Sequence, residues 1–351
     1  MSEKYVILEK NNRILITGAA GFIGFHLAKR LLAEGYLVYG IDNLNDYYDV
    51  RLKEARLEIL NQSEHFTFRK GNIADEQFIK EVFSQFEPDI VVNLAAQAGV
   101  RYSIENPGSY MESNVMGFYQ ILEACRHSYD EGKHPVKHPV KHLLFASSSS
   151  VYGNQKKVPF SVSDPVDHPI SLYAATKKSN ELMAYTYSHL YRIPSTGLRF
   201  FTVYGPYGRP DMAYFGFSEK IMADEPIKIF NNGDLCRDFT YIDDIVEGVA
   251  RMLGNPPQLN EEGDPYKVYN IGNNKPEKLM DFIHELEVQL GKEAKKEYYP
   301  MQPGDVYQTY ADVEELMKDF GYKPSTSLKE GLHSFAEWYL EWKQGSKKGM
   351  F

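Results

Sequence analysis

Cysteine is scarce in this chain of 351 residues, which has only Cys125 and Cys236. Two cysteines build neither a disulfide framework nor a cysteine-rich zinc site, and their scarcity is typical of proteins in a reducing compartment. Positive charge is in deficit as well, since 39 Lys and Arg face 48 Asp and Glu and the net charge is −9. A broad surface that neutralises nucleic-acid phosphates needs the opposite sign, so we expect no nucleic-acid partner.

Long apolar runs are also missing. No stretch reaches the ~20 apolar residues that a membrane-spanning helix needs. Near the N-terminus, charged residues flank the short run Tyr5–Leu8, so the segment lacks the apolar core of a signal peptide. We therefore expect a cytoplasmic protein that does not associate with a membrane. The length predicts about two domains or lobes.

Short runs rich in Val, Ile and Leu alternate with longer stretches of helical periodicity up to Pro194. The apolar runs cover residues 14–17, 37–41, 66–69, 90–94 and 143–146, and the helical stretches cover 22–33, 76–86 and 110–126. This alternation predicts an α/β fold with a Rossmann-type, doubly wound parallel sheet. We place an NAD-binding domain at 1–194 and a smaller mixed α/β C-terminal lobe, which binds the substrate, at 195–351. The boundary is interleaved, because the runs 195–200 and 267–271 are typical of buried strands that return to the first sheet.

The four residues Pro135–His138 are repeated at Pro139–His142. Histidines recur every four residues here, but proline prevents a helix from aligning them. We therefore expect a solvated, extended loop and no metal site.

The first predicted strand leads into a glycine-rich turn at residues 18–24, and an amphipathic stretch follows. Gly18 permits the tight turn, Gly21 allows a close approach to a pyrophosphate, and Gly24 allows the helix to pack on the strand. The helix N-terminus adds unpaired N–H groups and the positive end of a dipole. Together with Phe22 and Ile23, these glycines predict a dinucleotide-binding turn.

The second predicted strand is followed by Asp42 and Asn43, about twenty residues beyond the glycines, the spacing at which an acidic side chain accepts hydrogen bonds from the adenine ribose. Asp42 would repel a 2′-phosphate, and no Arg follows it closely, so we expect NAD rather than NADP. With two residues between successive glycines, the turn resembles that of the extended short-chain dehydrogenase/reductase superfamily.

Tyr173 and Lys177 are four residues apart in a predicted helix, so both project from the same face. An ammonium beside a phenol stabilises the phenolate, so we predict that Lys177 lowers the pKa of Tyr173 and makes it a general base. The superfamily resemblance places the catalytic hydroxyl at Ser148. Dehydratases and decarboxylases of the superfamily carry acids just after that hydroxyl, where this chain has Ser149 and Ser150, so the ketone has no obvious route to elimination.

Three further stretches, 199–213, 237–244 and 301–306, resemble the UDP-glucuronate 4-epimerases. The resemblance implies that Thr202 and Arg209 hold the sugar carboxylate, that Arg237 binds the UDP diphosphate, and that Asp305 reaches the uridine ribose. Galactose epimerases have Asn at the position of Thr202 and lack the run Arg209–Ala213.

The same resemblance implies a set of residues that line the NAD site: Asn72, Ile73, Leu94, Ala95, Ala96 and Asn114. It also implies a homodimer, in which the helices 110–126 and 172–191 of each subunit form a four-helix bundle.

The reaction implied is reversible, NAD-dependent C4 epimerisation of UDP-glucuronate to UDP-galacturonate through a 4-keto intermediate, without a metal. Tyr173 takes the O4 proton, Lys177 maintains the phenolate and contacts the nicotinamide ribose, and Ser148 positions O4. Other readings stay open: 4-epimerisation of UDP-glucose or UDP-N-acetylglucosamine, decarboxylation of UDP-glucuronate, or a non-catalytic NAD-binding sensor or scaffold. Fold alone does not decide among them.

Overall fold

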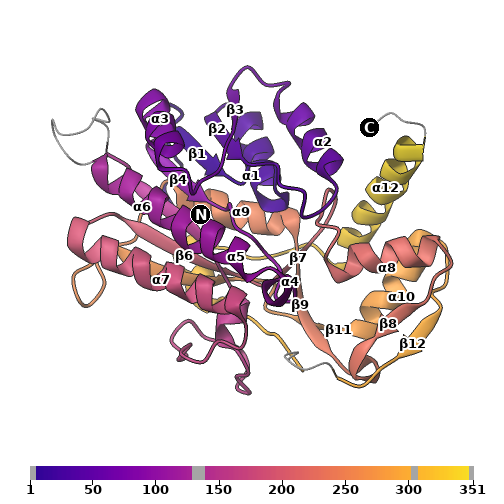
Figure 1. Cartoon of the computed structure of the whole chain (residues 1–351). Coiled ribbons are helices and arrows are strands. Elements are labelled where there is room, and N and C mark those ends of the chain that lie inside the picture. Colours follow the sequence, from indigo (N-terminus) through magenta and orange to yellow (C-terminus); the bar gives the residue numbers. More distant parts are fainter. Residues whose placement is uncertain (1–4, 129–138, 302–306, 348–351) are drawn as a thin grey trace.

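The computed structural model describes residues 5–128, 139–301 and 307–347 of the chain (Figure 1). Its centre is a parallel sheet of seven strands in the order β3-β2-β1-β4-β5-β6-β10. These strands are β1 (Arg13–Thr17), β2 (Leu37–Asp42), β3 (Phe66–Lys70), β4 (Ile90–Asn93), β5 (His142–Ser148), β6 (Ser195–Phe200) and β10 (Tyr266–Ile271). The chain runs outward from β1 to β3 and then resumes on the other side at β4. Ligands of such folds bind where this order reverses, outside the carboxyl ends of the strands.

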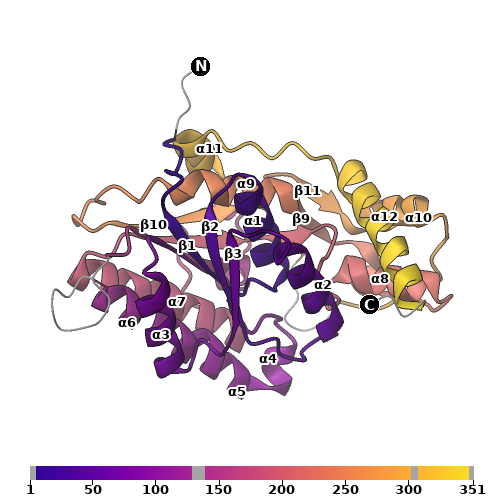
Figure 2. The same cartoon turned by 90° about the horizontal axis from the view of Figure 1, so that it is seen from above.

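Helices cover both faces of the sheet (Figure 2). Ile14 and Ile16 of β1 belong to the apolar cluster that includes α1 and α9, whereas Leu15, which points the other way, belongs to the cluster of α3 and α6. The flanking helices are α1 (Phe22–Ala33), α9 (Ile242–Leu253), α3 (Glu76–Phe86), α6 (Phe118–His127) and α7 (Leu172–Tyr191). Burial on both faces explains the continuous apolar character of these strands. The α/β Rossmann prediction is confirmed.

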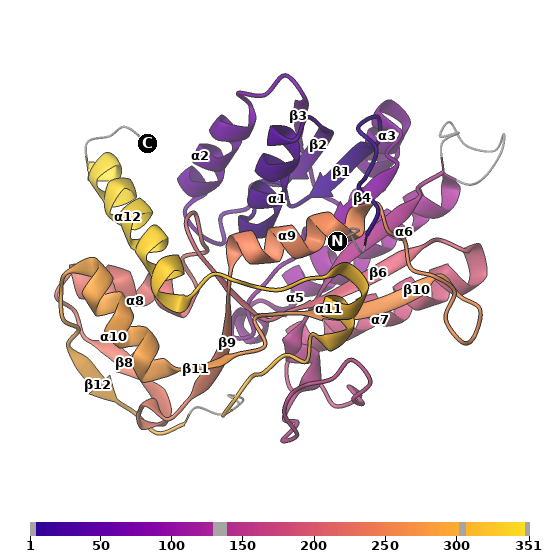
Figure 3. The same ribbon diagram turned by 180° about the vertical axis from the view of Figure 1, so that it is seen from behind.

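The second group of strands and helices lies beyond the carboxyl ends of the central strands (Figure 3). It has two small sheets, β11-β9-β7 and β12-β8. Their strands are β7 (Thr202–Tyr204), β8 (Ile227–Ile229), β9 (Cys236–Tyr241), β11 (Pro276–Lys278) and β12 (Lys296–Tyr298), and the helices around them are α8 (Ala213–Met222), α10 (Leu279–Leu290) and α12 (Leu328–Lys347). The short helix α11 (Glu314–Phe320) packs back on β10 and α9. As predicted, β6 and β10 return to the central sheet, so the two parts are interleaved.

One helical prediction needs correction, and one helix was not predicted. Residues 110–126 do not form one regular helix: the chain continues from α4 (Tyr102–Glu105) and α5 (Pro107–Tyr110) through a π-helical segment, Met111–Gly117, into α6. A π turn often occurs where a side chain must be offered to a site, and Asn114 lies in this one. The helix α2 (Val50–Leu60) was not predicted, because its buried face includes Lys53 and Arg56, whose charges obscure the apolar period.

The prediction of a solvated loop through His142 is also wrong. His142 begins β5 and is fully buried, and its ring nitrogens contact the Leu253 carbonyl oxygen and Thr196 Oγ1. His134 and His138 lie outside the described residues. In the part of the chain that the structure describes, no three His, Cys, Asp or Glu side chains are grouped as metal ligands would be. None of the described helices is both long and apolar enough to cross a membrane.

Candidate active site

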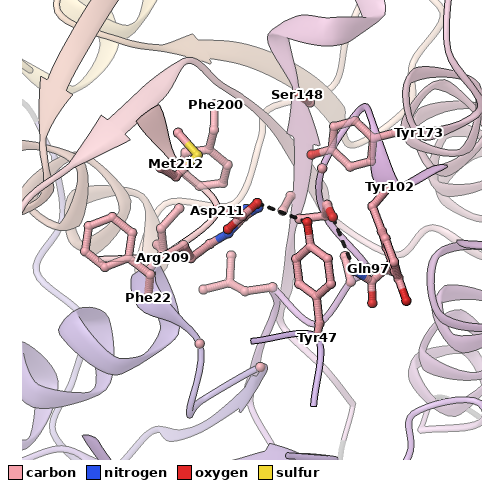
Figure 4. A pocket seen from close by; sticks show the side chains of 18 of the residues that line it. Phe22, Tyr47, Gln97, Tyr102, Ser148, Tyr173, Phe200, Arg209, Asp211 and Met212 are labelled. Carbon is pink, nitrogen blue, oxygen red and sulfur yellow. Dashed lines mark hydrogen bonds and ion pairs between the residues drawn. The ribbon is translucent and has the colours of Figure 1, made fainter. Parts of the chain in front are cut away.

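A cavity of about 920 Å³ lies at the carboxyl edge of the central sheet. One wall is the glycine-rich turn between β1 and α1, and the opposite wall is the start of β7 and the segment that leads into α8. Ser148, Tyr173 and Lys177 also line it, and Figure 4 shows the first two. The cavity therefore contains the predicted dinucleotide turn and the predicted catalytic group together.

The glycine-rich turn leaves no room for larger side chains. A Cβ added to Gly24 would lie 2.2 Å from the Gly18 carbonyl oxygen, and Gly18 itself has φ +71°. Gly21 is the N-cap of α1 without a side-chain cap, so the first N–H groups of the helix face the cavity instead of a protein acceptor. A pyrophosphate fits this arrangement of backbone donors.

Asp42 is held in place beside this turn. Its carboxylate accepts hydrogen bonds from the backbone N–H of Ala20 at 3.2 Å and of Leu44 at 2.8 Å, and it is 8% exposed. The side chain still lines the cavity, where a ribose hydroxyl could donate to it. The donor set thus fits a dinucleotide whose adenine ribose carries no 2′-phosphate.

Most of the residues predicted to contact NAD line the cavity: Gly18, Gly21, Phe22, Ile23, Gly24, Asp42, Asn43, Asn72, Ile73, Leu94, Ala95 and Ala96. Asn114 does not. Its amide donates to the Gln97 carbonyl oxygen and to Thr176 Oγ1, and it accepts from the Gln97 N–H at 2.8 Å. Asn114 therefore supports the segment that forms the cavity wall, and a direct contact with the cofactor stays a prediction.

The predicted catalytic residues come from two neighbouring elements. Ser148 is the last residue of β5, and Tyr173 and Lys177 lie one turn apart on α7. Ser148 Oγ accepts from the Ser150 N–H and donates to Ser150 Oγ, both at 3.1 Å, and it is close enough to the phenol of Tyr173 to influence its pKa. Lys177 Nζ donates to the Ala146 carbonyl oxygen at 2.9 Å. The end of β5 thus anchors the Lys177 ammonium and carries the Ser148 hydroxyl.

The pKa values in this group correct one prediction. Burial raises the pKa of Tyr173, while the Ser148 hydroxyl and the charge of Arg209 counteract part of the rise. Burial, together with a smaller contribution from the charge of Arg209, lowers the pKa of Lys177 to about 8. The prediction that Lys177 gives Tyr173 a lowered pKa is wrong for this structure, because desolvation of the phenolate outweighs the stabilising groups.

The residues predicted to hold a carboxylate lie on the wall opposite α1. Thr202 begins β7, and Arg209 lies in a turn closed by the Met212 N–H, which donates to the Arg209 carbonyl oxygen at 3.1 Å before α8 begins. Both line the cavity. Arg209 forms an ion pair with Asp211, and Tyr47 donates to the same carboxylate at 3.2 Å (Figure 4). Burial alone would lower the pKa of Arg209, but Asp211 outweighs it, so the pKa is raised.

Arg237, a predicted substrate contact, is not among the described residues that line the cavity. Arg237 lies on β9, where its Nη1 donates to the carbonyl oxygens of Cys236 and Tyr307 at 2.9 and 3.1 Å. Asp305 lies outside the described residues. Binding of the diphosphate and the uridine ribose by these two residues stays a prediction.

The sequence analysis missed several lining residues: Tyr47, Gln97, Arg101, Tyr102, Asp211, Lys228 and Phe230. Gln97 and Arg101 follow β4 at the carboxyl edge of the sheet, a position that could have identified them. The Arg101 guanidinium lies 5.6 Å from the centre of the Phe230 ring, and this contact joins the two parts of the molecule. Phe230 gives no sequence signal, because it meets Arg101 only through the tertiary fold.

The strand order, the glycine-rich turn and the Ser148, Tyr173 and Lys177 group define an NAD-dependent enzyme of the short-chain dehydrogenase/reductase superfamily with an added lobe. Residues 15–335 match the family described as GDP-mannose 4,6 dehydratase, and the chain belongs to that family.

Relatives across most of the chain carry more specific names. Protein CapI of Staphylococcus aureus is 53% identical over 341 residues, which are 94% of this chain and 99% of CapI. A probable UDP-glucuronate 4-epimerase of Rhizobium meliloti is 45% identical over 93% of this chain and 96% of its own. The UDP-glucuronic acid 4-epimerase of Bacillus cereus, solved with UDP-glucuronic acid and NAD, superimposes with a TM-score of 0.84 at 34% identity and covers 94% of this chain and 99% of its own.

Proposed function

We propose that this protein catalyses the reversible, NAD-dependent C4 epimerisation of UDP-glucuronate to UDP-galacturonate through a 4-keto intermediate. One observation carries the proposal: Arg209 lies in the same cavity as Ser148, Tyr173 and Lys177. A guanidinium that can bind the carboxylate of a uronate therefore lies in the same cavity as an acid/base group. The names of the Rhizobium meliloti and Bacillus cereus relatives support the substrate.

In this mechanism, Tyr173 takes the proton from O4 of the sugar and later returns it. Ser148, which lines the same cavity as Tyr173, positions O4. Lys177, which lies one turn from Tyr173 on α7, is held by the Ala146 carbonyl oxygen and supplies the positive charge of the site. NAD, when bound on the glycine-rich turn, supplies the acceptor for the C4 hydride and the donor that returns it. The 4-keto sugar presents its other face before the hydride comes back.

The intermediate of this reaction is a β-keto acid, which loses CO₂ readily when the bond to the carboxylate aligns with the carbonyl π system. We infer that Arg209 and Thr202 hold the carboxylate out of that alignment. Ser149 and Ser150 line the cavity where dehydratases and decarboxylases of the superfamily carry acids, so no acid stands at these two positions to complete an elimination. This difference favours an epimerase, although the family to which the chain belongs is named after a dehydratase.

The alternatives make different demands on the cavity. An epimerase of UDP-glucose or UDP-N-acetylglucosamine needs no cation at Arg209, and a decarboxylase needs the carboxylate left free to leave. A sensor or scaffold needs neither Tyr173 nor Lys177 in the cavity. The arrangement seen favours the uronate epimerase over each.

We also propose how the enzyme is organised and where it works. Residues 1–194 bind NAD and residues 195–351 bind the UDP-sugar, with strands exchanged between them. The cysteines are both free, which supports a cytoplasmic location. Exposed apolar side chains on the π-helical segment and the helices after it, Met116, Tyr119 and Leu182, support a homodimer through these helices.

The test is to incubate the purified protein with UDP-glucuronate, UDP-glucose and UDP-N-acetylglucosamine side by side and to separate the products. We expect UDP-galacturonate from the first and little conversion of the others. The Tyr173→Phe variant, which retains the ring, is the control and should bind the sugar without converting it. No conversion of UDP-glucuronate by protein that carries NAD would refute the proposal.

A further inference from the structure

Arg209 already has a carboxylate partner within the chain. Its Nε donates to Oδ1 of Asp211 at 3.0 Å, and its Nη2 donates to Oδ2. Each side chain is 24% exposed, and both line the cavity. Two parallel hydrogen bonds are also the way in which Arg holds any other carboxylate. A uronate carboxylate that binds the same edge of Arg209 must therefore compete with Asp211 for the same two N–H groups.

Asp211 has a second partner on the other side. The hydroxyl of Tyr47 donates to Oδ2 of Asp211 at 3.2 Å, and the Tyr47 ring packs against Tyr102 with 4.6 Å between ring centres. Burial, with a contribution from Asp211, raises the pKa of Tyr47 to about 12. The phenol thus stays protonated at neutral pH. Asp211 keeps a hydrogen-bond donor when Arg209 turns to another carboxylate.

We propose that Asp211 is a specificity-determining residue, which exchanges with the carboxylate of the uronate on Arg209. This inference rests on the proposed function. Asp211 neutralises Arg209 in the free site, and on binding the substrate carboxylate takes the guanidinium while Asp211 stays on Tyr47. A neutral hexose cannot take part in this exchange, so it leaves the Arg209–Asp211 pair intact.

The exchange also serves the turnover of the sugar. The ketopyranose must present its other face, so its carboxylate cannot keep one fixed position on Arg209 throughout the reaction. A guanidinium left without a partner in a partly buried site is unfavourable. Asp211 pairs with Arg209 again during this step and once more when the product leaves. The same carboxylate thus weakens substrate binding and assists turnover.

The experiment compares binding of UDP-glucuronate, UDP-glucose and UDP by titration calorimetry, with Tyr173→Phe as the background so that the bound sugar is not converted. Adding Asp211→Asn should increase the affinity for UDP-glucuronate by about tenfold, which is the effect of removing one competing charged hydrogen bond. The affinities for UDP-glucose and UDP should change less than twofold. In protein with Tyr173, the same variant should lower both KM and kcat for UDP-glucuronate.

Two further variants separate exchange from simple charge. Glu105→Gln removes another carboxylate from the cavity wall, and it should leave the affinity for UDP-glucuronate almost unchanged. Tyr47→Phe takes away the donor that holds Asp211 after the exchange, and it should weaken UDP-glucuronate binding while UDP binding stays the same.

The inference is overturned if the Asp211→Asn variant binds UDP-glucuronate no more tightly than the parent protein does. It is also overturned if Glu105→Gln increases the affinity for UDP-glucuronate as much as Asp211→Asn does, or if Tyr47→Phe leaves this affinity unchanged. Parent protein that binds UDP but not UDP-glucuronate would instead overturn the proposed function.

Discussion

Ser147 donates a hydrogen bond from its hydroxyl to Oε1 of Glu181 at 2.6 Å, so the residue before Ser148 is tied to the helix that carries Lys177. The Glu181 carboxylate also accepts hydrogen bonds from Nε and Nη2 of Arg199, at 2.8 and 3.0 Å. The Glu181 and Arg199 side chains are 3% and 4% exposed. This buried pair joins β5, β6 and α7 behind the catalytic group.

Glu181→Gln should destabilise the protein because it leaves Arg199 as a buried charge without its counter-ion. Removing one partner of a buried ion pair costs about 3–5 kcal/mol, and urea unfolding measures the loss. Glu76→Gln is the control, since its pair with Lys80 is more than half exposed, and such a pair contributes about 0–1 kcal/mol. Equal urea midpoints for the two variants would show that the buried pair does not stabilise the fold.

Gly24→Ala and Gly216→Ala should have opposite effects, although both glycines lie within helices. A Cβ at position 24 meets the Gly18 carbonyl oxygen at 2.2 Å, whereas one at position 216 meets nothing within 4 Å. Gly24→Ala should therefore lose bound NAD and more than about 1 kcal/mol of stability. Gly216→Ala should gain about 0.5–1 kcal/mol, because alanine orders the helix at lower entropic cost.

The absorbance of the bound dinucleotide measures the NAD content of the two glycine variants, and the thermal midpoint of unfolding measures their stability. Full NAD content in Gly24→Ala would contradict the assignment of the turn.

The buried Lys177 should make the protein less stable than it would be without that charge. Because burial lowers its pKa from 10.5 to about 8, the unfolded chain binds more protons between pH 8 and 10.5, and stability rises with pH over that window. Below pH 8 the full penalty is present, on the order of 3 kcal/mol from the pKa difference.

Lys177→Met should therefore unfold at higher urea than the parent at pH 7, and the gap should shrink as the pH rises toward 10.5. Activity should be lost at every pH. Lys80→Met, at an exposed lysine, is the control and should show no such pH dependence. A Lys177→Met protein that is less stable than the parent at pH 7 would contradict this account.

The elements with a clear sequence signal were predicted well. The alternating apolar runs gave the sheet, including the return of 195–200 and 267–271, and the helices 22–33 and 76–86 match α1 and α3. Several of the failures share one cause. The cavity-facing groups Tyr47 and Asp211, the buried charge of Arg56 in α2 and the rise in the pKa of Tyr173 depend on contacts between distant segments, which no local pattern records.

Arg209→Ala should change the fate of the intermediate more than its formation. Without the guanidinium, the carboxylate of the 4-keto uronate is free to align with the carbonyl π system, so CO₂ loss competes with return of the hydride. We expect a larger proportion of UDP-pentose relative to UDP-galacturonate, measured by mass spectrometry of the products. Thr202→Val, which removes one hydroxyl from the same wall of the cavity, should shift the ratio in the same direction by less.

The matched control is Arg101→Ala, which removes an arginine from another part of the cavity wall. It should weaken binding of the nucleotide sugar and leave the product ratio as it is, because its guanidinium lies against the Phe230 ring, whereas Arg209 is the arginine paired with Asp211. Arg209→Ala protein that still binds UDP-glucuronate and yields the parent ratio of epimer to pentose would show that the carboxylate is restrained elsewhere. A rise in pentose with both arginine variants would point to general loosening of the cavity, since of these two arginines it is Arg209 that we infer to hold the carboxylate.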